Sequence, residues 1–359
     1  MTIKNFSIEY DAINSKNIFT NGDTINGRIV VEVSGETKVQ SLIFRAQGRA
    51  KVVWTEHYGE NQTHVYWSNE DYYDVKHDIL RKSRQVGTEV ISKGRHVFPF
   101  SFRIPNGRLP STYKGAHGKI IHKVKAELKQ SMRLTKKAKV HFQFVSKADM
   151  GIPGLLEPQY AFKDKSVGVF GSGKVSVDVH TKQMGYMQGE AIVVTLEINN
   201  NSKRSVKPKF ILYEKNSFFA QGHRKLYMHD ILKEKAEAIE GSSGRKTVTK
   251  VINIPRDLPP SILNSSIIKL EYRLKVQLDI KCAIDPKIKL PIVIMPGVPQ
   301  MEQLHASAAI GFVNFRNPGK PAWATVPQQA PPQCADLPPA YGAHAMYPSF
   351  PLDDYKTTL

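Results

Sequence analysis

The last part of the chain holds the residues whose spacing has the most specific chemistry, Pro338, Pro339 and Tyr341 in the pattern Pro-Pro-x-Tyr. Two successive prolines hold the backbone in the extended polyproline II form, so such a segment loses little conformational entropy when it docks. The proline rings can stack in an aromatic-lined groove while the tyrosine fills a neighbouring pocket. This spacing therefore predicts a ligand for WW domains.

Two further segments nearby match peptide ligands less completely. Pro331 and Pro332 repeat the proline pair, but a cysteine stands at the tyrosine position and would leave the aromatic pocket empty. We expect weak binding or none at this degenerate second motif. Tyr347, Pro348 and Leu352 have the loosely spaced Tyr-Pro-xₙ-Leu pattern of ligands for endosomal-sorting adaptors.

The residues around these motifs have little capacity to build a core. Eleven of the 22 prolines lie from Pro296 onward, and the alternation of apolar and polar residues stops there. A segment of this kind cannot bury enough apolar area to offset the entropy lost on ordering. We therefore expect residues 301–359 to be a disordered, proline-rich tail in which a partner can reach the motif.

A second group of interest is a run of lysines with odd numbers, Lys119, Lys123, Lys125 and Lys129. Residues two apart on a strand share a face, so these side chains should lie together. The formal net charge of +19 favours partners of opposite sign. One interpretation is a solvated outer face, and the other is a surface for phosphorylated protein tails or for an anionic membrane. The sequence does not choose between them.

Signals for catalysis, metals or nucleic acid are poor. Residues 168–174 match most of a phosphate-binding loop, but Val175 replaces the hydroxyl residue that would bind Mg²⁺, and a strand pattern follows where a helix is needed. The two cysteines cannot make a four-ligand zinc site, and no nucleophile elbow or nucleic-acid motif is present. We expect no catalytic residues, cofactor or metal, and no nucleic-acid partner.

The elements that must position these residues are predicted to be β-strands. The cleanest pattern runs from Leu270 to Ile280, where apolar even-numbered residues alternate with polar odd-numbered ones. One buried face and one wet face are typical of antiparallel sheets packed in pairs. The chain also lacks an apolar run long enough to span a membrane as a helix. The pattern therefore predicts an all-β fold.

The strand pattern occurs twice. Gly22 and Gly189 each open an alternating strand, and Ile104-Pro105 and Ile254-Pro255 each precede a long strand by the same distance. Marks that recur in the same order indicate a duplicated sandwich. We expect an amino-terminal sandwich over residues 1–150, an inter-domain connection over 151–173, a second sandwich over 174–300 and the tail over 301–359.

Two segments fit the repeated pattern less well. The first copy contains an insertion between Trp54 and Tyr73 that is rich in aromatic residues. These side chains either cover a sheet end, which we favour, or line a binding surface. Residues 232–239 have a helix-forming composition within an all-β chain, and we expect a loop or a distorted strand there.

Taken together, the tandem sandwiches, the Gly22-Asp23 and Gly189-Glu190 openings, the paired Ile-Pro marks and the Pro-Pro-x-Tyr motif resemble the α-arrestins. The segment from Ile3 to Tyr10 is most similar to the arrestin domain-containing proteins of vertebrates. The resemblance implies two tandem immunoglobulin-like arrestin β-sandwiches. It also implies an adaptor that brings HECT-type ubiquitin ligases to membrane receptors or transporters, which are then ubiquitinated, endocytosed and sorted through endosomes.

Carried over residue by residue, the resemblance implies that Pro338, Pro339 and Tyr341 bind the WW domains of the ligase. The family usually has two such motifs, and an incomplete second one removes the avidity gain of bivalent binding. The resemblance further implies a cytoplasmic protein that is peripheral at the plasma membrane and endosomes. The alternative is a ligase-independent endosomal trafficking scaffold that binds cargo or coat proteins through its sandwich faces, since a fold does not fix a function.

Overall fold

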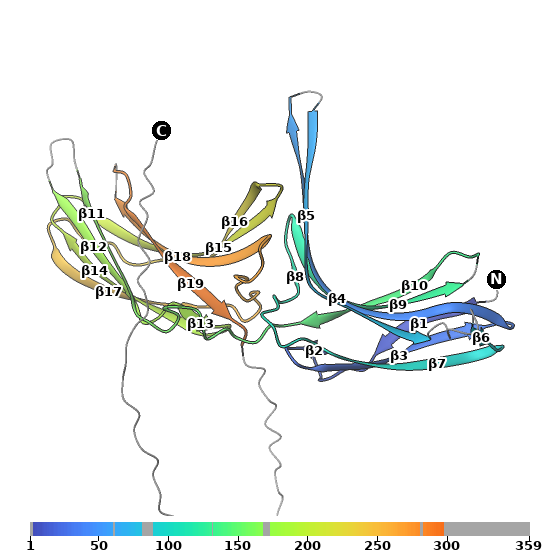
Figure 1. The fold of residues 1–359 in the computed structure, drawn as a ribbon. Coiled ribbons are helices and arrows are strands. Elements are labelled where there is room, and N and C mark those ends of the chain that lie inside the picture. Colours follow the sequence, from blue (N-terminus) through green and yellow to red (C-terminus); the bar gives the residue numbers. More distant parts are fainter. Residues whose placement is uncertain are drawn as a thin grey trace, which may run out of the picture. The chain divides into compact units, whose positions relative to one another are not determined.

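In the computed structural model the described residues are 3–59, 62–80, 89–130, 132–167, 173–280 and 283–297, and their regular structure is all β-strand (Figure 1). They form four sheets that pack in two pairs, which confirms the predicted class of two tandem β-sandwiches. The proline-rich tail predicted for residues 301–359 lies outside the described residues, as does Cys282.

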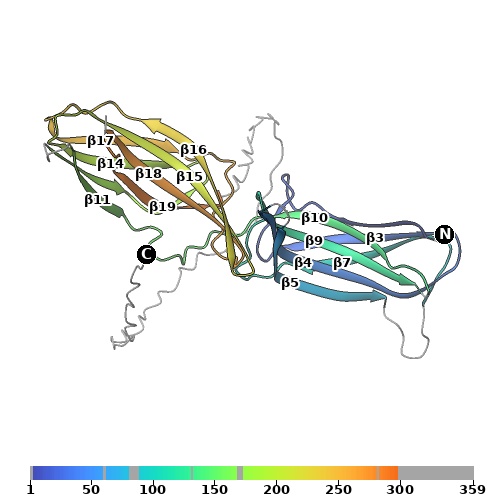
Figure 2. The same cartoon turned by 90° about the horizontal axis from the view of Figure 1, so that it is seen from above.

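The first sandwich packs a small sheet against a large one. Its strands are β1 Ile3–Tyr10, β2 Ile18–Phe19, β3 Thr24–Val33, β4 Thr37–Tyr58, β5 Gln62–Leu80, β6 Glu89–Ile91, β7 Gly94–Arg103, β8 Tyr113–Lys114, β9 Gly118–Gln130 and β10 Lys136–Phe144. The small sheet has the order β1-β3-β7 and the large sheet β2-β10-β9-β4-β5, with β6 paired to β4 and β8 to β9. Figure 2 shows β10, β9, β4 and β5 of the large sheet side by side.

The second sandwich has the same two-sheet construction. Its strands are β11 Gln159–Ser166, β12 Lys174–Thr181, β13 Gly185–Met187, β14 Ala191–Asn200, β15 Val206–Ala220, β16 His223–Lys235, β17 Gly244–Asn253, β18 Ile268–Ile280 and β19 Lys287–Met295. The small sheet has the order β11-β12-β14-β17 and the large sheet β13-β19-β18-β15-β16.

The two sandwiches repeat one topology, as the sequence marks predict. The equivalent strands β9 and β18 are each 13 residues long. β9 lies between β10 and β4, and β18 lies between the corresponding strands β19 and β15. The short strands β2 and β13 both pair in parallel with the last strand of their sandwich. Gly22 and Gly189 both have φ = 84°, in the turns that precede β3 and β14. That left-handed conformation explains why glycine opens each copy.

Each core lies between the facing sheets, where alternate side chains are buried. In β18 every even-numbered residue from Ile268 to Ile280 is buried, because one face of the strand packs inward. The first core also contains His122, which is 1% exposed. Its Nε2–H donates to the Pro110 carbonyl at 3.0 Å, and its Nδ1 accepts from the Tyr73 hydroxyl at 3.0 Å. Burial lowers the pKa of His122 to about 4, against a smaller opposing effect of the Pro110 bond.

The expected inter-domain connection, residues 151–173, contains a strand of the second sandwich. β11 pairs with β12 along its whole length and forms the edge of the small sheet. The sequence signal for β11 is weak because Tyr160 and Phe162, 75% and 61% exposed, point to solvent instead of into a core. The strand after residues 168–174 is confirmed as β12, where a phosphate-binding loop would need a helix.

The segment over residues 232–239 is a distorted strand in its first half, which is one of the two forms expected. β16 continues to Lys235, and its pairing with β15 shifts register between Leu212 and Tyr213. Beyond that strand, Ile239 makes a single bridge to Val206. The register shift leaves Ile231, the residue just before this segment, without a partner on β15.

Candidate functional site

The lysines singled out in the sequence lie on the outer face of the large sheet in the first sandwich. Lys119, Lys123, Lys125 and Lys129 are on β9, where the even-numbered side chains such as Val124 are buried in the core. The odd-numbered side chains therefore point away from the core and share one face.

Neighbouring strands bring more basic residues to the same face. On one side, β4 places Lys51 opposite Lys119 and Arg45 opposite Lys125. On the other side, β10 places Lys139 opposite Lys125. His141 also joins the face, opposite Lys123. Lys139 belongs to a basic run that is visible in the sequence, but the sequence alone did not place it or the other three residues on this face, because strand pairing brings them together.

Part of this positive charge is neutralised by β5, the next strand of the sheet. Arg45 makes a paired hydrogen bond with Asp74, and Arg49 does the same with Asp71. These guanidinium groups hold the pKa of both aspartates below the usual value. On β9 itself, Lys125 Nζ lies 2.9 Å from a carboxylate oxygen of Glu127.

Several lysines on this face, Lys129 among them, have no ion pair with a carboxylate within the part of the chain that the structure describes. Four of them, Lys51, Lys119, Lys123 and Lys139, lie on the adjoining strands β4, β9 and β10 and are called here the lysine cluster. Burial lowers the pKa of Lys123, and its basic neighbours lower it further. Burial also lowers the pKa of His141, and three nearby lysines, of which Lys123 has the largest effect, lower it further. The cluster is therefore a site of unrelieved positive potential, which a bound anion would stabilise.

The β4–β5 hairpin extends beyond this sheet (Figure 1). The side chains on one of its faces contact the second sandwich. Trp54 and Tyr66 stack with their ring centroids 5.1 Å apart, and Tyr66 also lies 4.6 Å from the ring of His223. Lys225 Nζ lies 2.9 Å from Glu56 Oε1. Part of the aromatic insertion is thus a buried junction between the two sandwiches, which sequence reasoning considered only as a sheet end or a binding surface.

Polar contacts reinforce this junction. Glu70 of β5 accepts hydrogen bonds from the Ser265 hydroxyl at 2.6 Å and from the Ser266 backbone N–H at 3.0 Å. Burial raises the pKa of Glu70, but these bonds outweigh it and hold the pKa below its usual value. The Tyr113 hydroxyl donates to Asn216 Oδ1 at 2.7 Å. These contacts, from β5 and from β8, therefore add hydrogen bonds to the apolar junction with the second sandwich.

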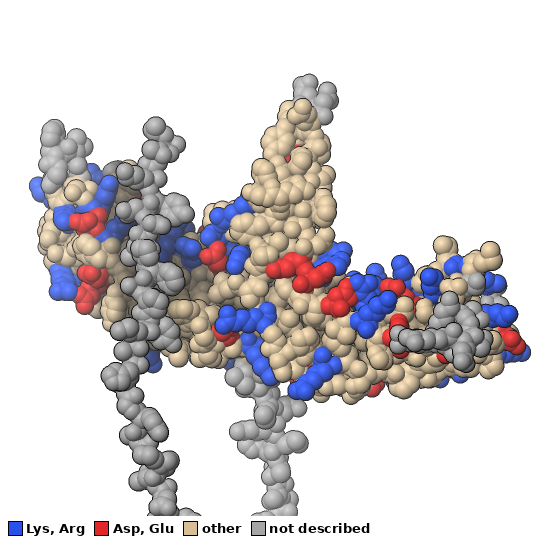
Figure 3. Space-filling model, in the orientation of Figure 1, with Lys and Arg blue, Asp and Glu red and all other residues tan. Residues whose placement is uncertain are grey.

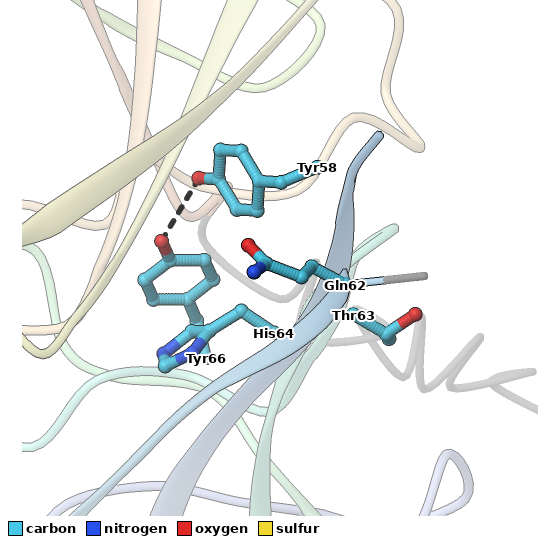
Figure 4. Close-up of a pocket in the computed structure, with 5 residues that line it drawn as sticks. All are labelled: Tyr58, Gln62, Thr63, His64 and Tyr66. Carbon is cyan, nitrogen blue, oxygen red and sulfur yellow. Dashed lines mark hydrogen bonds between the residues drawn. The ribbon is translucent and has the colours of Figure 1, made fainter. Parts of the chain in front are cut away.

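A shallow pocket lies near the tip of the hairpin, lined by Tyr58, Gln62, Thr63, His64 and Tyr66 (Figure 4). The Tyr58 and Tyr66 hydroxyls are 3.0 Å apart, as the dashed line marks. Tyr58 also donates to Glu56 at 2.8 Å. Since its hydroxyls are engaged with one another and with a carboxylate, the pocket offers polar contacts rather than an activated nucleophile.

Among the described residues no group of three or more His, Cys, Asp or Glu side chains is placed to hold a metal ion. The same residues contain no helix that is long and apolar enough to cross a membrane. The peptide motifs found in the sequence lie outside the described residues: Pro331, Pro332, Pro338, Pro339, Tyr341, Tyr347, Pro348 and Leu352.

Comparison with known proteins gives matches over both sandwiches. The family model for the arrestin (or S-antigen) N-terminal domain matches residues 6–151, and that for the arrestin C-terminal domain matches residues 171–297. Arrestin domain-containing protein 4 of Mus musculus is 30% identical over 287 residues, which cover 78% of this chain and 69% of that protein. Its Homo sapiens counterpart is 30% identical over 286 residues, covering 78% and 68%. Thioredoxin-interacting protein of Homo sapiens is 26% identical over 296 residues, covering 81% and 74%.

Proposed function

Because this chain belongs to the arrestin family, in its α-arrestin branch, we propose that it is an adaptor that recruits WW-domain HECT-type ubiquitin ligases to membrane receptors or transporters. Recruitment would promote the ubiquitination of these cargo proteins, followed by their endocytosis and endosomal sorting. The adaptor would act in the cytoplasm, peripherally at the plasma membrane and at endosomes.

The observation that carries the ligase arm is the Pro338, Pro339 and Tyr341 motif, placed beyond the last described strand. The motif presents two rings and a phenol to a WW domain at a low entropic cost. A single complete motif acts without the avidity of a pair, since Pro331 and Pro332 lack the tyrosine.

The sandwiches would supply the cargo arm. The lysine cluster offers unpaired positive charge on one sheet face, which suits a phosphorylated cytoplasmic segment of a receptor or an anionic membrane surface. In this proposal the first sandwich (residues 1–150) and the second sandwich (residues 174–300 together with β11) bind cargo, and residues 301–359 are the ligase-binding tail.

The ligase arm is tested by titrating isolated WW domains of HECT-type ligases with the full chain. Tyr341→Ala should weaken binding roughly tenfold to a hundredfold, because it empties a pocket whose occupation by a large side chain is worth about 1.5–3 kcal/mol. Tyr347→Ala is the matched control, because it removes a tyrosine from the same segment but not from the motif.

Equal loss in both variants would argue against the motif, and so would unchanged binding after Tyr341→Ala. A third variant, Cys334→Tyr, completes the second motif. It should tighten binding only to ligase fragments with two linked WW domains, because the gain is one of effective concentration.

The alternative is a trafficking scaffold that works without a ligase. It is favoured by the lysine cluster and by Tyr347, Pro348 and Leu352, which match ligands of endosomal-sorting adaptors. Tyr341→Ala would then leave cargo transport unchanged, whereas Tyr347→Ala would impair it. Measuring cargo transport and cargo ubiquitination in the two variants therefore separates the alternatives, because only the ligase adaptor needs Tyr341 for both.

A further inference from the structure

The β4–β5 hairpin has a second face, opposite the one that contacts the second sandwich. Its cross-strand pairs are Lys51 with Asn69, Val53 with Trp67, Thr55 with Val65 and His57 with Thr63. None of these eight residues is acidic. In Figure 3 the projecting end of the hairpin shows hardly any charged side chains, whereas charged side chains gather around its base.

Apolar side chains on this outer face are exposed to solvent. Val53 is 57% exposed, Val65 48% and Trp67 58%. Trp54, the next residue along from Val53, is only 4% exposed because it faces the second sandwich. The hairpin is thus covered on one face and has an apolar surface, centred on a tryptophan, on the other. Such a surface in a folded protein marks an interaction site more often than chance.

This apolar surface is continuous with the lysine cluster. Lys51 is two residues before Val53 on the same face of β4, and it lies opposite Lys119 on β9. From the tip toward the sandwich, the polar pair His57 and Thr63 is followed by the apolar side chains Val65, Val53 and Trp67, and then by the unpaired lysines. Amphipathic surfaces with this order suit the interface of a bilayer, where apolar side chains enter below the anionic headgroups and lysines remain among them.

We propose that the outer face of the β4–β5 hairpin, with the lysine cluster beside it, is a docking surface for an anionic bilayer. Val53, Val65 and Trp67 enter the headgroup region, and the lysines contact the lipid phosphates and carboxylates. This docking surface includes the anion-binding face that we suggest for the cargo arm of the adaptor. It does not depend on the recruitment of a ligase.

Charge and exposure together favour a bilayer over the other occupants. A second copy of the chain on the same face would bring two lysine clusters together, and like charges repel. A phosphorylated peptide would pair with the lysines but would leave Val53, Val65 and Trp67 in water. Only an extended surface that is both anionic and apolar satisfies both halves of the site.

Binding is tested with the full chain and vesicles of pure phosphatidylcholine or of phosphatidylcholine mixed with phosphatidylserine. Sedimentation should show binding to the anionic vesicles, with a weak signal on the neutral ones. The double variant Lys119→Gln/Lys123→Gln should reduce partitioning roughly 25-fold, because each lysine near such a surface contributes about a factor of five. Its control is Lys287→Gln/Lys289→Gln, which removes the same charge from β19 of the second sandwich.

The apolar half of the surface is tested with Trp67→Ala, which should weaken partitioning roughly tenfold through the loss of apolar area. Phe162→Ala is the matched control, because Phe162 is 61% exposed on β11, away from the site. In a chain carrying Trp323→Phe, lipids brominated on their acyl chains should quench the fluorescence of Trp67. Adding Trp67→Phe should abolish that quenching and leave only the signal of Trp54.

Three results would overturn the proposal. The first is equal loss of binding in the two lysine pairs, which would indicate net charge alone. The second is unchanged partitioning and no quenching at Trp67. The third is the absence of vesicle binding together with capture of a phosphorylated peptide that depends on Lys123 but not on Trp67. WW-domain binding measured on the same variants should be unaffected, so failure here and failure of the ligase arm are separate results.

Discussion

Glu70 of β5 and Ser265, which lie 195 positions apart in the chain, are joined by a hydrogen bond of 2.6 Å from the serine hydroxyl to the carboxylate. Ser265 is 2% exposed, and its hydroxyl in turn accepts the backbone N–H groups of Ile267 and Ile268. One carboxylate of the first sandwich thereby orders the turn that leads into the central strand of the second.

Glu70→Ala should destabilise the described sandwiches by about 1.5–3 kcal/mol, the range for hydrogen bonds to a charged group. The lost acceptor leaves the Ser265 hydroxyl and the Ser266 N–H short of a partner. Unfolding in urea measures the change, and Glu237→Ala, at an exposed position, is the control. A loss in Glu70→Ala no larger than that in the control would show that the junction is held by its apolar contacts alone.

The two tryptophans of the hairpin should respond very differently to truncation. Trp54→Ala should cost about 3–5 kcal/mol, because the ring is buried in a cluster shared by both sandwiches. Trp67→Ala should change stability by less than about 0.5 kcal/mol, because its ring lies in solvent. Thermal unfolding of the two variants provides the comparison. A large loss in Trp67→Ala would mean that its face is already covered and would weaken the membrane assignment.

His122 should make the first sandwich sensitive to acid. Its folded pKa of about 4 lies below the ordinary value of 6.5, so folding favours the neutral ring. The contribution is fully present above about pH 6.5 and is lost as the pH falls toward 4, amounting to about 3 kcal/mol over that window. His122→Gln should flatten this part of the pH profile, whereas His77→Gln, at an exposed position, should not.

The stability of both variants is to be measured by urea unfolding between pH 7 and pH 4. An unchanged slope in His122→Gln would mean that other groups carry the acid sensitivity. Asp71 and Asp74, whose folded pKa values are held low by Arg49 and Arg45, lose their stabilising contribution only below about pH 5, where the unfolded carboxylates begin to take up protons. The slope between pH 7 and about pH 5 therefore reports His122 without them.

How much the sequence predicts depends on whether a feature is local. Leu270 to Ile280 could be assigned as a strand from alternation alone, and Gly22 and Gly189 marked the repeat because the turn needs a left-handed residue. The shared face of the β9 lysines also follows from the sequence, because all four have odd numbers and alternate residues of a strand point to the same side. Arg45 and Lys51 could not be added to that face, since only the register of β4 against β9 brings them there.

In the β4–β5 hairpin, by contrast, the sequence alone does not determine which aromatic side chains are buried. Trp54 and Trp67 are the same residue type in one aromatic segment, and no local pattern says which of them is covered. The answer comes from Phe218 and Ile268 of the second sandwich, which belong to the same buried cluster as Trp54. β11 was missed for a related reason, because its aromatic residues face outward and leave no inward apolar pattern.

The parallel pairing of β2 with β10 has a consequence for synthesis on the ribosome. Phe19 lies beside Phe144, so the first sandwich cannot close until nearly all of its residues have emerged. The hairpin then waits longer, because the residues that cover Trp54 arrive only with β15 and β18. During that interval the growing chain carries an aromatic surface on both faces of one hairpin. We expect this high contact order to make nascent chains slow to fold and dependent on chaperones.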